Sequence, residues 1–154
     1  MNSQYFVTPG KVNSIGLSVF ISLLIFMAGC VQQTNVSAVD PLAKAYFEAL
    51  KNGEIDKALD MYSDDFFKQV PREAWKEKLQ RLTAELGPIK AYSFRNKQAD
   101  SRFSGEFYIY QYDTIHSGPN GKEKRAKHTV TFIQPVNSNK IKIAGHMIKA
   151  EGFE

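Results

Sequence analysis

The sequence has one cysteine, one tryptophan and three histidines among 154 residues. A single cysteine excludes a disulfide framework and a cysteine-rich zinc site. Lys and Arg exceed Asp and Glu only by 20 to 16, far from the strong basic clusters of nucleic-acid-binding proteins, so we expect no nucleic-acid partner. No motif indicates a cofactor or names a reaction. The hydrophobic content of 43% is nevertheless enough for the core of one folded domain.

The N-terminal region has the pattern of a signal peptide. Residues 1–14 contain Lys11 and no acidic residue, and residues 15–27 carry no charge. As a helix this apolar run would extend roughly 20 Å, less than the ~30 Å hydrocarbon core of a bilayer. A spanning helix is the alternative, and it would have to extend over residues 12–31 and include several polar side chains.

The end of this run, Met27-Ala28-Gly29-Cys30, resembles the lipobox of bacterial lipoproteins. The resemblance implies cleavage before Cys30, so that residues 1–29 are the signal peptide, and a diacylglyceryl group on the Cys30 sulfur, with palmitate among its acyl chains. Two or more acyl chains anchor a protein stably in a membrane. Because Val31 rather than Asp follows the cysteine, the resemblance also implies the periplasmic side of the outer membrane, if the source has one. A plain secretory signal, or a buried structural cysteine, is the alternative.

Residues 30–39 are small and polar and predict a flexible tether, so the folded domain is expected at 40–154. Asp40-Pro41 predicts the start of a first helix at 41–51, and a second is expected near 54–62. We expect residues 64–67 to be a link whose aromatic side chains enter the core. A third helix begins at Val70-Pro71 and ends at Gly87-Pro88; its apolar face comprises Trp75, Leu79, Leu82 and Leu86.

The second half alternates between apolar and polar residues, as β-strands do. We predict strands at 89–96, 105–116, 122–134 and 140–150, joined by Gly-, Pro- and Asn-rich turns, with a bulge at Gly145. The expected fold class is therefore α+β: three N-terminal helices packed on a curved four-stranded antiparallel sheet.

This order of elements resembles the cone-shaped nuclear-transport-factor-2-like superfamily, particularly its small exported, uncharacterised members. The resemblance is carried by AYFEALKNGEIDKALDMYS, by the Trp-bearing helix that ends in LG, and by KIAGHMIK, and it covers residues 40–150. It implies a cone with a cavity. The superfamily contains isomerases, dehydratases, polyketide cyclases and proteins that only bind a ligand or partner, so the fold does not select the function.

An enzyme of this kind would need an acid or base beside a partner in the cavity. Strand alternation places Asp113 on the face opposite His116, so these two cannot pair. Asp113 could reach His128 or His146 only if their strands pair in a suitable register. The alternative is that these are ordinary sheet histidines, one of them buried and bonded to backbone. Three histidines on separate strands lack metal-ligand spacing, so we expect no metal site.

Two further groups suggest binding surfaces. Tyr108, Tyr110 and Tyr112 share one face of a strand and indicate either a pocket or an interface. The first interface to consider is a homodimer through the sheet face, and the alternative is that the tyrosines simply pack on a half-buried strand. The second group is basic and could contact anionic lipid headgroups, or merely solvate a strand; it comprises Lys122, Lys124, Arg125 and Lys127.

These observations favour a membrane-tethered protein of a bacterial cell envelope that binds a small-molecule or protein ligand without catalysis. The alternative is an isomerase- or cyclase-like enzyme with an Asp/His pair in the cone cavity.

Overall fold

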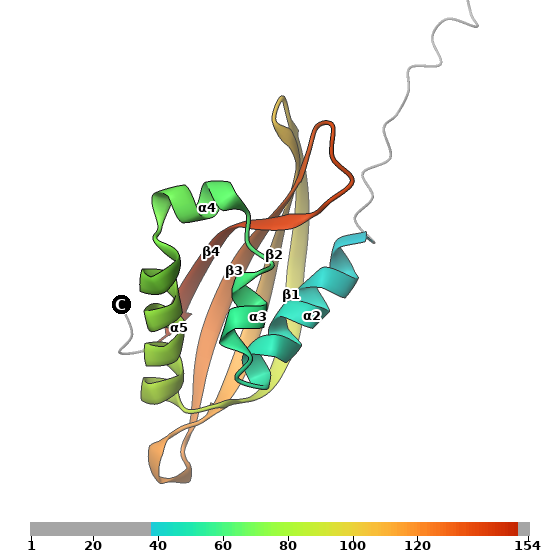
Figure 1. Ribbon diagram of the computed structural model, residues 1–154. Helices are drawn as coiled ribbons and strands as arrows, with labels where there is room; N and C mark the ends of the chain where they lie inside the picture. The colour runs from blue at the N-terminus through green and yellow to red at the C-terminus, as the bar shows by residue number, and fades with distance from the viewer. Residues whose placement is uncertain (1–37, 151–154) are drawn as a thin grey trace, which may run out of the picture. The chain divides into compact units, whose positions relative to one another are not determined.

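The structure is a computed structural model that describes residues 38–150, so the signal peptide, the lipobox and most of the predicted tether lie outside the described residues. The described chain has an α+β fold with a four-stranded antiparallel sheet in the order β1-β2-β3-β4 (Figure 1). Its elements are α2 (Val39–Lys51), α3 (Ile55–Leu59), α4 (Asp64–Gln69), α5 (Arg72–Leu86), β1 (Ile89–Arg102), β2 (Gly105–Ser117), the short 3-10 helix η3 (Pro119–Gly121), β3 (Glu123–Pro135) and β4 (Lys142–Ala150). None of the helices in this part of the chain is long and apolar enough to cross a membrane.

The first helix starts two residues earlier than predicted, at Val39, and Asp40 is not its cap. Ala38 occupies the N-cap position without a side-chain hydrogen bond. The Asp40 carboxylate instead accepts a hydrogen bond of 2.6 Å from the Tyr110 hydroxyl on β2. This bond fixes the first turn of α2 on the sheet.

The segment predicted as a link is a helix, α4, so the described domain has four α-helices rather than three. Ser63 has an extended backbone, and its hydroxyl accepts a hydrogen bond from the Phe66 amide at 3.2 Å, which makes it a helix N-cap. Asp64 and Asp65 in the first turn add favourable charge at the helix N-terminus. Phe66 enters the core as expected, with 7% of its surface exposed.

The antiparallel meander is confirmed, and so is the irregularity at Gly145. Thr131 pairs with Gly145 whereas Phe132 pairs with Ile143, so β4 carries one extra residue at this point. β1 is longer than predicted, because its pairing with β2 continues to Arg102, opposite Gly105, at the hairpin end.

The helices lie on one face of the sheet, here called the inner face (Figure 1). Burial along β2 alternates, and the inner positions are the even-numbered residues from Tyr108 to His116. Phe47 of α2 packs on Tyr112 with ring centroids 4.2 Å apart. The odd-numbered side chains of β2 point to the opposite, outer face.

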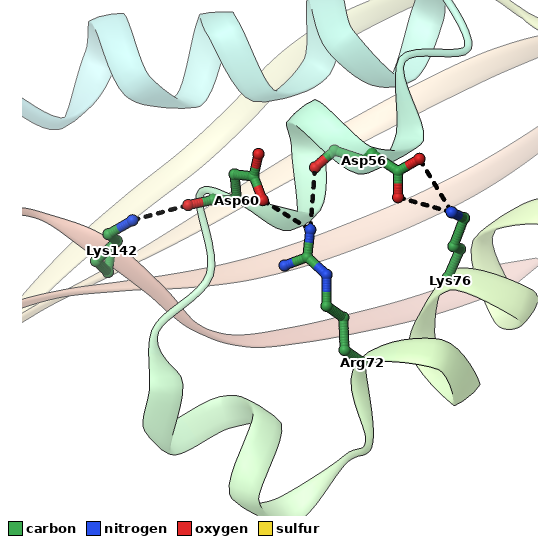
Figure 2. Close-up of polar contacts among 5 residues, drawn as sticks. All are labelled: Asp56, Asp60, Arg72, Lys76 and Lys142. Carbon is green, nitrogen blue, oxygen red and sulfur yellow. Dashed lines mark hydrogen bonds and ion pairs between the residues drawn. The ribbon is translucent and has the colours of Figure 1, made fainter.

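Exposed ion pairs join α5 to the α3 segment at the surface, and a hydrogen bond joins β4 to the same segment (Figure 2). Arg72 of α5 donates to the Asp60 carboxylate at 2.7 Å, and Lys76 donates to Asp56 of α3 at 2.7 Å. Lys142 donates to the Asp60 backbone carbonyl at 2.7 Å. These contacts link α3, α5 and β4 at the surface, and the two exposed ion pairs each add little free energy of folding.

Candidate functional site

The three histidines of the protein belong to one continuous series of hydrogen bonds inside the domain. His116 Nδ1 lies 2.8 Å from the Gly87 carbonyl, and its Nε2 lies 2.9 Å from the Thr114 hydroxyl. That hydroxyl lies 3.1 Å from His128 Nε2, and His128 Nδ1 lies 2.9 Å from His146 Nε2. We call this series, with the two tyrosines described next, the histidine chain.

The far end of the histidine chain is a pair of tyrosines. His146 Nδ1 lies 2.9 Å from the Tyr46 hydroxyl and 2.8 Å from the Tyr62 hydroxyl, and the two hydroxyls are 2.7 Å apart. Three groups that can donate or accept a proton therefore converge at one point between α2, the α3–α4 connection and β4.

Sheet register brings these residues together. Thr114 pairs with Ala126 and His128 pairs with Ile148, so the side chains of the histidine chain are diagonal neighbours across β2, β3 and β4. Diagonal neighbours on one face lie close enough for long side chains to touch. His116, Thr114 and His128 are 0%, 0% and 1% exposed, while His146 is half-buried on the edge strand.

Backbone geometry fixes both ends. Gly87 has a φ of +85°, and a Cβ there would overlap the Ser117 carbonyl, so the turn that presents the Gly87 carbonyl to His116 requires glycine. At the other end Tyr62 forms a parallel bridge with Ile143 of β4, through Ile143 N to Met61 O and Ser63 N to Ile143 O. The bridge holds Tyr62 next to His146.

The Gly87 carbonyl can only accept a hydrogen bond, and this sets the direction of every bond when the histidines are neutral. His116 donates from Nδ1, so its Nε2 accepts from Thr114. The Thr114 oxygen then accepts from His128 Nε2, and His128 Nδ1 accepts from His146 Nε2. His146 Nδ1 is left as the acceptor for the tyrosine hydroxyls. Each ring nitrogen thus has a partner without any charge.

Burial keeps these groups neutral. Removal from water lowers the pKa of His128 to about 3, with a further lowering by His116. It also lowers the pKa of His146 well below its usual range, helped by His128 and Lys78. The His116 pKa is lowered by burial and partly restored by the Gly87 carbonyl. Burial likewise raises the pKa of Tyr46 and Tyr62. A proton could pass along such a chain only through a charged intermediate that this environment disfavours.

Aromatic rings surround the tyrosine end. Trp75 of α5 lies 5.6 Å from His146 and 6.2 Å from Tyr62, measured between ring centroids, and 6% of it is exposed. Phe47 meets His128 edge to face at 5.5 Å. These contacts pack the histidine chain as part of the core.

The sequence hypothesis of an Asp113–histidine pair is wrong in this structure. Asp113 pairs with Lys127 in the register of β2 and β3, and it lies on the outer face. Its carboxylate accepts two bonds from Arg95, from Nε at 2.7 Å and from a terminal nitrogen at 2.6 Å. His128 and His146 point to the inner face, where no Asp or Glu of residues 38–150 bonds to either ring.

The predicted tyrosine stripe faces the helices. Tyr108, Tyr110 and Tyr112 are 0%, 1% and 7% exposed. Tyr110 holds Asp40 of α2, and Tyr112 packs on Phe47. The stripe therefore attaches α2 to the sheet. Because the three tyrosines are buried beneath the helices, they do not form the predicted interface with a second copy.

The four predicted basic residues do not form one patch. Lys122 is exposed after η3, and Lys124 donates to the Glu85 carbonyl near the end of α5 at 2.9 Å. Arg125 and Lys127 alternate with buried Ala126 and His128, and so lie on the outer face.

Sequence reasoning missed Thr114, Tyr46 and Tyr62 as parts of the site. Alternation already puts Thr114 on the face of the tyrosine stripe, which was the available signal. The partners on α2 and on the α3–α4 connection carry no such signal, because only the tertiary fold brings them to His146. Among residues 38–150 no group of three or more His, Cys, Asp or Glu side chains is arranged to hold a metal ion.

Comparison with known proteins shows the fold alone. No family model and no curated protein matches the chain. Among solved structures, the Bdellovibrio bacteriovorus protein Bd1075 superposes with a TM-score of 0.53 at 11% identity, over 74% of this chain. A Catenulispora acidiphila protein does so with a TM-score of 0.54 at 14% identity, over 73% of this chain and 88% of its own. The chain spans only 41% of the Bd1075 structure. At these identities the likeness extends to the α+β architecture and not to a family or an activity.

Proposed function

We propose that this chain is a lipid-anchored protein of a bacterial cell envelope whose domain binds a ligand or partner without catalysis. The observation that carries the non-catalytic part is the histidine chain. Every ring nitrogen of the three histidines has a hydrogen-bond partner, and burial holds His128 and His146 neutral. A general base works best with a pKa near the working pH, and burial moves the pKa of both rings away from that range, which supports a non-catalytic role.

The anchor rests on the sequence. The chain has one cysteine, at the position that the lipobox resemblance requires, directly after an uncharged apolar run. If Cys30 is lipidated, growth with a clickable palmitate analogue labels the wild-type protein and leaves Cys30→Ala unlabelled and unprocessed. Equal labelling of the two chains contradicts the anchor. A Cys30→Ser chain serves as the isosteric control and should behave as Cys30→Ala does.

A partner would pack on the outer face of the sheet. The described helices cover the other face (Figure 1), and the outer positions of β2 and β3 include half-buried apolar side chains, Phe107, Ile109, Ile115 and Ile133. They alternate with polar side chains such as Gln111, Asp113 and Lys127, so the face offers a partner both apolar and polar contacts. A second copy of the chain is one such partner.

One observation favours the second candidate, an isomerase- or cyclase-like enzyme. Tyr46, Tyr62 and His146 converge within 2.9 Å of one another, as acid–base groups in an active site do. The enzyme would need His146 to titrate near neutral pH. A measured pKa of His146 close to 6.5 would favour it over the binding module.

A further inference from the structure

The molecule presents an exposed apolar tip where two loops meet. Phe103 in the β1–β2 turn is fully exposed, at 107%, and Val136 in the β3–β4 turn is 52% exposed. The Val136 amide donates to the Ser104 carbonyl at 3.3 Å, which joins the two loops. We call Phe103 and Val136 the hairpin tip.

The first turn of α2, where the chain enters the described fold, is the end of that helix nearer to the hairpin tip. Asp40 in the first turn of α2 contacts Tyr110 and Lys97, in the middle of β2 and β1. Glu48, nearer the end of α2, contacts Tyr92 at the other end of β1. The helix therefore runs away from the tip, and its first turn lies roughly 20 Å from Phe103 along β1.

The charged side chain next to Phe103 is already paired. Arg102 binds Asp100 at 2.6 Å and lies over the Phe107 ring, and Glu106 accepts bonds from Ser101. Phe103 itself is uncharged, and the charge of its neighbour Arg102 is balanced by Asp100. An exposed aromatic side chain in that setting can leave water without also burying an unpaired charge.

We propose that the hairpin tip inserts into the interfacial region of the lipid bilayer to which the chain is tethered, an inference that rests on the proposed function. The tip offers about 300 Å² at most, well below the roughly 800 Å² per partner of a stable protein interface. A weak apolar contact suffices when a tether supplies a high local concentration of membrane. From Cys30 to Ala38 the chain can extend to roughly 28 Å, enough to let the tip reach the surface.

The proposal orients the domain. The tip faces the bilayer, and Lys122 in the β2–β3 turn faces away from it. The reason is that β2 begins at Gly105, near the tip, and ends at Ser117, near Lys122, at the opposite end of the sheet. A membrane-facing basic hairpin is the opposite orientation.

Tryptophan depth measurements distinguish the two. The mature chains of Phe103→Trp and Lys122→Trp, from residue 30 onward and with a free Cys30 thiol, are each coupled through this single cysteine to maleimide lipid in vesicles with or without brominated acyl chains. Wild-type protein gives the background from buried Trp75. Phe103→Trp should lose most of its added emission in brominated vesicles and shift to shorter wavelength, while Lys122→Trp should keep its emission.

Quenching of Lys122→Trp alone, equal quenching of both variants, or quenching of neither overturns the proposal. Chemical coupling makes the result independent of whether Cys30 is lipidated in cells. The palmitate-labelling experiment tests that separately, so failure of the anchor and failure of the tip remain distinguishable.

Discussion

The two faces of the sheet stabilise their polar groups differently: the inner face by hydrogen bonds between neutral buried side chains, and the outer face by ion pairs exposed to solvent. On the inner face the histidine chain satisfies six side chains without a charge, and burial lowers the pKa of each histidine. On the outer face Asp113 is paired with Arg95, whose side chain is 58% exposed, and Lys90 lowers the pKa of Glu123. Solvent screens the outer pairs, whereas an inner group that loses its partner stays buried and unsatisfied. Changes on the inner face should therefore cost far more stability.

The largest loss is expected at Trp75, which packs the tyrosine end of the histidine chain. Trp75→Ala leaves a cavity in the core and should lower the free energy of unfolding by about 3–5 kcal/mol. Chemical denaturation followed by circular dichroism measures it. Trp75→Phe is the matched control and should lose clearly less, because it keeps an aromatic ring. A Trp75→Ala protein as stable as wild type would contradict the packing of α5.

Acid should act almost as strongly. The unfolded chain protonates its histidines below about pH 6.5, whereas folded His128, with a pKa of about 3, and His146 stay neutral. The contribution of these histidines to the free energy of unfolding is therefore fully present above pH 6.5 and is lost as the pH falls below it. Between pH 7 and pH 5 the loss is about 2 kcal/mol for His128, and the lowered pKa of His146 adds to it in the same direction. Denaturant titrations across this range measure it, and a flat profile would show that the histidines are already charged in the fold.

Each of the two tyrosine hydroxyls should be able to replace the other as the hydrogen-bond donor to His146. Either one can donate to His146 Nδ1, so Tyr46→Phe and Tyr62→Phe should each cost only about 1 kcal/mol. The double variant leaves Nδ1 without a donor and should cost about 1–3 kcal/mol more than the sum of the two. Additive losses in this double-mutant cycle would mean that only one hydroxyl bonds to His146. Tyr92→Phe, which loses a bond to Glu48 near the surface, is the control.

The smallest effect on the free energy of unfolding is expected for substitutions on the outer face of the sheet. Asp113→Asn removes the charge that Arg95 binds on the outer face, and it should change the free energy of unfolding by about 0–1 kcal/mol. Thermal melts of Asp113→Asn and Arg95→Gln at low and high salt measure it. A loss as large as that of an inner-face variant would contradict the difference between the faces.

The sequence was sufficient for the parts of the fold that local rules determine. Strand alternation separated Asp113 from His116, and Gly87-Pro88 marked the end of α5. The helix α4 was missed because its capping residue, Ser63, precedes a stretch whose aromatic residues suggested a buried link. The site was predicted only in part. His128 and His146 were identified as candidates, but their partners depend on the register of β2, β3 and β4 and on the docking of α2, which the sequence pattern does not encode.

Nitrogen NMR of the imidazole rings tests the neutral histidine chain most directly, and with three histidines in the sequence the spectrum is simple to assign. At pH 7 we expect the Nδ1–H tautomer for His116 and the Nε2–H tautomer for His128 and His146. The signals of His128 should stay unchanged down to pH 5, and His146 should not titrate near pH 6.5. Titration of His128 or His146 with a midpoint near pH 6.5, or the reverse tautomers, would contradict the account.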